Sequence, residues 1–114
     1  MSRTLNKELF FSMTYDFLNL FLVQQNNKSL HTVESYRDGL TIFRRYVCVK
    51  REIPLYSFMF SDCTYEFLLD YTSYLLSDLK YKESSVNQRL AAIKSYVAYA
   101  AERDISLQQI CFSV

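Results

Sequence analysis

Glycine and proline are nearly missing from this sequence, which has one residue of each among 114. Globular proteins average about 7% glycine and about 5% proline. Because tight β-turns are built largely from these residues, their scarcity argues against a sheet-rich fold and favours long helices. Half of the residues are hydrophobic and 22% are charged, which excludes a disordered chain. A chain of this length forms one domain, so we expect residues 1–114 to fold as a single unit.

Metal-binding residues are also scarce. The sequence has one histidine, His31, and three cysteines, Cys48, Cys63 and Cys111, with no CxxC pair. This excludes a zinc site at the usual ligand spacings, and three unpaired thiols suit a reducing cytoplasm. No apolar run reaches the ~18–20 residues of a membrane span. We therefore expect a cytoplasmic protein with no metal, no cofactor, no small-molecule ligand and no membrane contact.

Charge is unevenly distributed, although the formal net charge is only +1. Residues 28–51 hold six lysines and arginines against two acids, and residues 80–94 hold four against one. Between them, residues 52–79 hold five acids and no lysine or arginine. If the two basic segments meet in the folded domain, they give it a positive face despite the near-neutral sum.

Apolar residues recur at steps of three and four in four stretches, which predicts an all-α bundle of four helices. The first covers about residues 7–25 and the third about residues 63–79, after a cap at Ser61 or Asp62. The second begins at a Thr32 cap, and the fourth begins with the capping box Ser85-x-x-Gln88. A short fifth helix is expected around residues 107–112. The side chains expected in the core are Leu9, Met13, Phe17, Leu20, Phe21, Val33, Tyr36, Leu40, Phe43, Val47, Leu68, Tyr71, Leu75, Leu79, Val86, Leu90, Ile93, Val97 and Ala100.

The connection over residues 50–62 contains Pro54 and has no sustained apolar period. Its apolar side chains Leu55, Phe58 and Phe60 are expected to dock against the core.

Two helix faces could carry function. The second helix has a basic flank, Arg37, Arg44 and Arg45, which either neutralises phosphates or is solvated and paired with nearby acids. The fourth has a face of Ser, Asn, Gln and Ala edged by Lys94, with no acid from residue 84 to residue 101. Small side chains let a backbone approach a grooved partner, and hydroxyls and amides can donate to phosphates or base edges. We expect Arg37 and Lys94 to share one electropositive concave surface.

The ten tyrosines do not predict catalysis. A tyrosine hydroxyl has an ordinary pKa near 10 and needs neighbouring cations or a base to act as a nucleophile. No cluster of His, Lys and Arg converges on one in this sequence, and several tyrosines fall on apolar helix stripes. We therefore expect no enzymatic activity from this chain.

Two segments resemble the N-terminal core-binding (SAM-like) domain of tyrosine recombinases, the phage-integrase family. Residues 29–43, SLHTVESYRDGLTIF, resemble the pattern S-x-x-T-x-x-S-Y-x-x-D-L-x-x-F of the second helix. Residues 84–96, SSVNQRLAAIKSY, resemble the pattern S-x-x-T-I-N-R-R-L-S-A-L-R-S-F of the fourth. The run FLLDY at residues 67–71 is similar to the F-L-x-Y-L pattern of the family's third helix. The similarity extends over nearly the whole chain.

The resemblance implies a DNA-binding domain that clamps duplex DNA at the strand-exchange site of a site-specific recombinase. Its catalytic residues would belong to a second domain, which this chain lacks, and its partners would be double-stranded DNA and other recombinase protomers in a synaptic complex. The protein would associate with the nucleoid when on DNA. The resemblance implies that Arg89 contacts DNA. Its position on the helix instead places it toward the edge of the core, where its side chain would connect the fourth helix to its neighbours. The residues nominated for DNA contact by the resemblance or by charge are Lys28, Thr32, Ser35, Tyr36, Arg37, Arg44, Ser85, Asn87, Gln88, Arg89, Lys94 and Ser95.

The alternative is a helical protein-interaction module that binds no nucleic acid. It would use the Tyr- and Phe-rich surface and the acidic third helix, with an interface centred on Glu66 and Asp70. A mixed case has protomers touching through the first helix or the C-terminal segment.

Overall fold

The computed structural model describes residues 8–25 and 27–108, which fold into helices joined by short connections. No strand occurs among them, and the only sheet-like pairing is an isolated antiparallel bridge between Leu9 and Met59. The predicted all-α bundle is confirmed. The four α-helices are α1 (Thr14–Asp16), α2 (Leu30–Arg45), α3 (Tyr65–Ser73) and α4 (Glu83–Arg103).

Three of these helices continue as π-helical turns, and 3₁₀ turns fill the connections. A 3₁₀ turn, Phe10–Met13, precedes α1. The π-helical extensions follow α1, α2 and α3 and span Phe17–Gln25, Tyr46–Lys50 and Tyr74–Asp78. The remaining 3₁₀ turns are Leu55–Ser57, Phe60–Asp62 and Ile105–Leu107.

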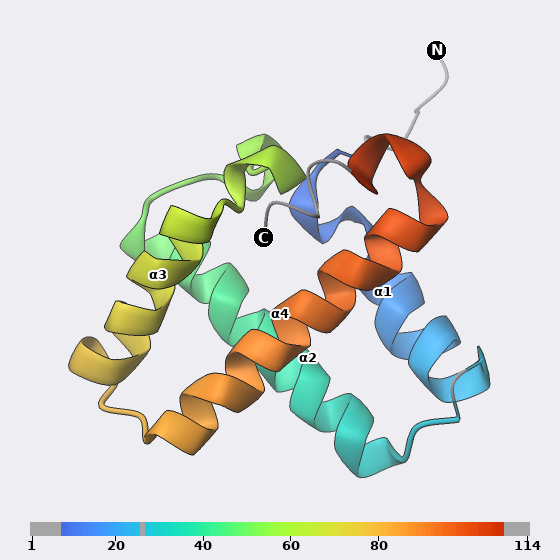
Figure 1. Cartoon of the computed structure of the whole chain (residues 1–114), viewed down its shortest axis with the longest axis horizontal. Coiled ribbons are helices and arrows are strands. Elements are labelled where there is room, and N and C mark those ends of the chain that lie inside the picture. Colours follow the sequence, from blue (N-terminus) through green and yellow to red (C-terminus); the bar gives the residue numbers. More distant parts are fainter. Residues whose placement is uncertain (1–7, 26, 109–114) are drawn as a thin grey trace.

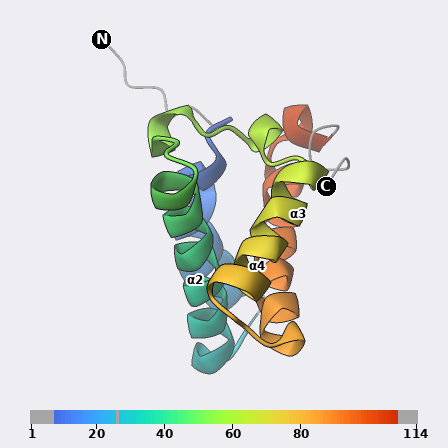
Figure 2. The same ribbon diagram turned by 90° about the vertical axis from the view of Figure 1, so that its left-hand side faces the viewer.

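Helices α2 and α4 cross each other at the centre of the molecule (Figures 1 and 2). The segment that begins with α1 lies beside one pair of their arms, and α3 lies beside the opposite pair (Figure 1). At the crossing, a Cβ atom on Gly39 would lie 2.7 Å from the Cβ of Ala92 and 3.7 Å from the backbone oxygen of Arg89. Real Cβ atoms do not approach so closely, so only glycine at position 39 permits this separation of the two helices.

The core is unusually aromatic and is organised around Phe10. The Phe10 ring lies 5.4 Å from Phe43 of α2, 5.4 Å from Phe58 and 5.0 Å from Phe60 of the connection, and 5.3 Å from Tyr96 of α4. Tilted and edge-on ring pairs at such separations contribute about 0.5–1.5 kcal/mol each beyond the area they bury. One side chain therefore joins four segments that are distant in sequence.

Tyr96 supplies the polar counterpart of this aromatic contact. Its hydroxyl donates to the Phe10 carbonyl oxygen and accepts from the Met13 backbone N–H at 3.0 Å. Both backbone groups belong to the 3₁₀ turn before α1, and Tyr96 itself is fully buried. The hydroxyl satisfies two backbone groups that would otherwise be costly to bury.

Three predicted helix starts are wrong. The cap of α2 is Ser29, whose hydroxyl accepts from the Thr32 backbone N–H, so Thr32 lies inside the first turn. The cap of α3 is Thr64, whose hydroxyl accepts a hydrogen bond from the Phe67 backbone N–H. The Thr64 backbone is extended, as is usual for a residue that caps a helix. Helix α4 begins at Glu83 after Lys82, and the capping box predicted at Ser85 is one turn inside it.

The predicted core is confirmed for most residues and wrong at three leucines. Leu20, Leu55 and Leu79 are 40%, 37% and 37% exposed. Leu18 and Leu22 are buried in place of Leu20, because the widened turns after α1 shift the helical phase that a single α-helix would keep. Phe58 and Phe60 dock inward as expected. Of the fifth helix predicted around residues 107–112, only Leu107, which ends a 3₁₀ turn, and Gln108 are described, and residues 109–112 lie outside the described part.

We predict that Gly39→Ala destabilises the domain by about 1–3 kcal/mol, because the added methyl group forces α2 and α4 apart. An unhindered Gly→Ala change in a helix would instead stabilise by about 0.5–1 kcal/mol. Urea denaturation measures the difference. In an Ala92→Gly background the same substitution should be neutral or stabilising, and an equal loss in both backgrounds would contradict the close crossing.

Candidate nucleic-acid interface

The N-termini of α2 and α4 both lie along the lower edge of the molecule, that of α2 at the lower right and that of α4 at the lower left of Figure 1 (Figures 1 and 2). The first-turn N–H groups of a helix give its N-terminus a partial positive charge, which attracts anions. Three exposed lysines flank these two starts: Lys28 precedes α2, and Lys80 and Lys82 precede α4. We call this region the N-terminal end, defined by Lys28, Lys80, Lys82 and the first turns of α2 and α4.

The lysines of the N-terminal end form no ion pair with any described residue. The two ion pairs found among these residues join Lys50 to Asp78 at 3.3 Å and Arg51 to Asp70 at 3.6 Å. Both join the end of the α2 segment to the α3 segment, and Asp78 of the first pair lies two residues before Lys80. Of the acids close in sequence to these lysines, Glu34 and Glu83 are exposed, and Asp78 is paired with Lys50.

The structure separates Arg37 from Lys94, so the expected surface that contains both is wrong. Gly39 of α2 faces Ala92 of α4. Arg37 and Lys94 each lie two residues away from these contact residues, and two residues correspond to a rotation of about 200° around a helix, so each side chain lies nearly opposite the contact. Arg37 lines a groove with Thr14, Tyr15 and Asn19 of the α1 segment. Lys94 lines a different groove with Tyr65, Leu69 and Thr72 of α3. The two side chains point away from the crossing in opposite directions.

The other nominated residues divide between these regions. Thr32 and Ser35 of α2, and Ser85 and Gln88 of α4, lie in the first two turns of their helices, toward the N-terminal end. Arg44 lies on the outer side of α2 with Arg37, in a surface groove that also includes Arg45. Asn87 is exposed and, like Lys94, lies on the side of α4 away from α2.

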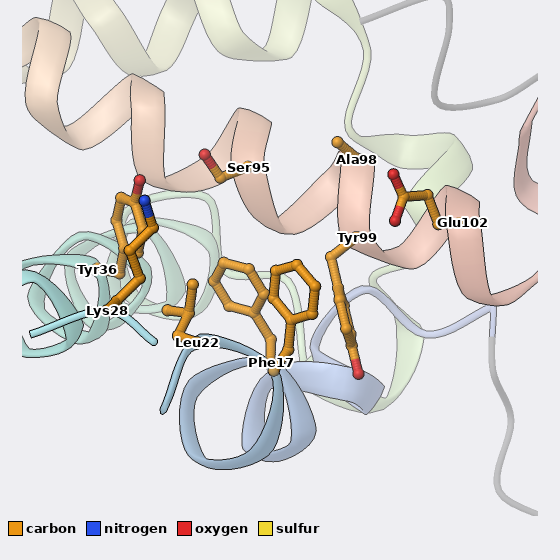
Figure 3. Close-up of a pocket in the computed structure, with 9 residues that line it drawn as sticks. Phe17, Leu22, Lys28, Tyr36, Ser95, Ala98, Tyr99 and Glu102 are labelled. Carbon is orange, nitrogen blue, oxygen red and sulfur yellow. The ribbon is translucent and has the colours of Figure 1, made fainter. Parts of the chain in front are cut away.

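Lys28, Tyr36 and Ser95 meet in a pocket between the α1 segment, α2 and α4 (Figure 3). The pocket has a volume of about 290 Å³, and its other walls are mainly Phe17, Phe21, Leu22 and Tyr99. Glu102 lies at its opposite end (Figure 3). Sequence periodicity could not show this meeting, because the three residues lie on three different segments.

Lys80 and Lys82, which lie beside the start of α4, are not among the residues that the sequence nominates. The sequence places them in a basic segment but predicts a later helix start, at Ser85, and so does not place them beside the positive end of the helix. The signal that could have found them is the run KYKESS at residues 80–85, in which two cations directly precede a helix start.

Comparison with known proteins identifies the family. A family model described as phage integrase SAM-like domain matches residues 10–114. The chain belongs to this family. No curated protein and no solved structure matches it. The resemblance seen in the two sequence motifs is thereby confirmed over nearly the whole chain.

In this integrase domain Arg89 joins α4 to the α3 segment. Its Nε is buried without a hydrogen-bond partner among the described residues, and its guanidinium lies 5.9 Å from the Tyr81 ring centre. It also acts electrostatically on buried Tyr71. This placement agrees with the helical position that put Arg89 at the core edge.

Tyr71 is held in its neutral form. Burial raises the pKa of its hydroxyl well above the ordinary value, and the positive charge of Arg89 only partly opposes that effect. A neutral, fully buried hydroxyl makes a poor nucleophile.

The described part of the integrase domain offers neither a membrane span nor a metal site. None of its helices combines the length and the apolar character needed to cross a bilayer. No three His, Cys, Asp or Glu side chains gather within it where they could ligate a metal ion.

We predict opposite outcomes for two buried Tyr→Phe substitutions. Tyr96→Phe should lower the free energy of unfolding by about 1–3 kcal/mol, because it leaves two buried backbone groups without a partner. Tyr71→Phe should leave it unchanged or raise it by about 1 kcal/mol, since the removed hydroxyl has no partner among the described residues. Thermal and urea denaturation measure both. Equal losses would contradict this difference and would indicate a buried water between Tyr71 and Arg89.

Proposed function

We propose that this integrase domain binds duplex DNA through its N-terminal end, as the DNA-gripping part of a site-specific recombinase. Membership in the phage integrase SAM-like family supports this proposal. The observation that carries it is that two long helices begin along one edge of the molecule, α2 beside Lys28 and α4 beside Lys80 and Lys82. Such a protein would work in the cytoplasm on the nucleoid.

The chemistry of the N-terminal end suits a duplex. Helix N-termini and lysines attract phosphates, while the short polar side chains of Ser35, Ser85 and Gln88 let the backbone come close and can donate to phosphate or base edges. The major groove, about 12 Å wide, admits one helix. In this arrangement the domain supplies position and affinity, and bond cleavage falls to other residues of the recombinase.

A charge-reversal pair tests which surface binds. Lys80→Glu/Lys82→Glu should raise the Kd for a 30-base-pair duplex at least about tenfold and reduce the salt slope by about 2, since each lost phosphate contact removes about 0.9. The matched control is Arg44→Glu/Arg45→Glu, which makes the same charge change on the outer side of α2. Fluorescence anisotropy at several salt concentrations measures binding, and circular dichroism checks folding.

Two results would contradict the proposal. If the Arg44/Arg45 variant loses more affinity than the Lys80/Lys82 variant, the outer side of α2 is the DNA surface. If the unmodified domain binds duplex with no salt dependence, or does not bind it, phosphate contact at the N-terminal end is wrong.

A second candidate is contact with another recombinase protomer through α3. Tyr65, Leu69 and Leu76 lie at helical spacing on one side of the α3 segment and are 58%, 47% and 45% exposed. Large apolar side chains exposed in a row are typical of protein contact sites. Concentration-dependent association in sedimentation experiments, abolished by Leu69→Glu, would support it; a monomer at all concentrations would count against it.

A further inference from the structure

One end of the pocket in Figure 3 is polar, and its side chains have no hydrogen-bond or ion-pair partner in the described part of the chain. The Lys28 ammonium, the Tyr36 hydroxyl and the Ser95 hydroxyl all belong to its lining. In the view of Figure 3, Lys28 and Tyr36 lie at the left end of the pocket, and Ser95 lies on α4 beside that end. None of the three head groups makes a hydrogen bond or ion pair with a described residue. Donors and positive charge from α2, from the residues just before it and from α4 thus line the same pocket.

The shape of the pocket limits what could bind there. Its aromatic walls are covered: Phe17 is fully buried, and Tyr99 is 6% exposed. The Arg103 guanidinium lies 4.6 Å from the Tyr99 ring centre and 5.5 Å from that of Phe21. A nucleobase therefore finds no free ring face for stacking.

Charge decides which end of the pocket is used. Glu102 at the far end repels an anion, whereas Lys28 at the near end attracts one. The groups that remain available are one ammonium and two hydroxyls, which are among the groups that contact DNA phosphates in proteins. A tetrahedral anion carries enough acceptor oxygens for all three groups.

We infer that Lys28, Tyr36 and Ser95 together hold one phosphodiester group of bound DNA. The inference rests on the proposed function, since Lys28 also belongs to the N-terminal end and the DNA strand that reaches that end would continue past the pocket. The site is formed only when the α1 segment, α2 and α4 are packed together, so it would secure the DNA to the crossing itself and not to one helix.

Single substitutions with matched controls test the inference on duplex binding. Lys28→Gln should lower the salt slope by about 1, whereas Arg45→Gln, which also removes one positive charge, should not. Tyr36→Phe should weaken binding about threefold to tenfold through loss of one hydrogen bond, whereas Tyr15→Phe, at an exposed tyrosine outside the pocket, should have no effect. Each variant is first checked for an unchanged melting temperature.

A titration with inorganic phosphate separates this site from the proposed function. In NMR spectra the Tyr36 ring signals should shift saturably with phosphate, and Lys28→Gln should remove the shift. If the unmodified domain binds duplex but Lys28→Gln and Tyr36→Phe behave like their controls, the phosphate site is wrong and DNA binding stands. If phosphate shifts Tyr36 but duplex does not bind, the assignment to DNA is overturned and only a free-anion site remains.

Discussion

The close crossing of α2 and α4 is the constraint on which the remaining structure depends. Because Gly39 has no side chain, the two helices approach until Ala92 fills the space above it. The crossing leaves one pair of helix arms to be covered by the α1 segment and the opposite pair by α3 (Figure 1). It also directs both helix N-termini to one edge of the domain, where each partial positive charge adds to that of the nearby lysines.

Aromatic packing holds the outer segments onto this crossing. Phe10 touches rings from α2, from the connection and from α4, and the Tyr96 hydroxyl fixes the backbone of the turn that carries Phe10. Arg89 and Arg51 perform a similar task on the α3 side, each placed against aromatic rings. Each of these arginines stabilises the domain through packing as well as through charge, because its guanidinium lies against an aromatic ring.

The candidate site was predictable in part. The two motifs placed functional residues near the starts of two helices, and Ser35, Ser85 and Gln88 do lie toward one end. The pairing of Arg37 with Lys94 failed because the periodicity of each helix defines only its own apolar side. It does not say which part of the remaining surface faces the other helix. Two residues that are both polar on their own helices can therefore point in opposite directions once the helices cross.

From the sequence by itself follow the all-α class, the positions of the apolar stripes in α2 and α4, the inward docking of Phe58 and Phe60, and the family. These properties depend on local spacing and composition, which each segment carries within itself. The tertiary structure alone decided the register of the widened turns, the exposure of Leu20, and the meeting of Lys28, Tyr36 and Ser95. The π-helical turns change which residues of the α1 segment face the core, and the position of the pocket depends on how α2, α4 and the α1 segment pack around the crossing of Gly39 and Ala92.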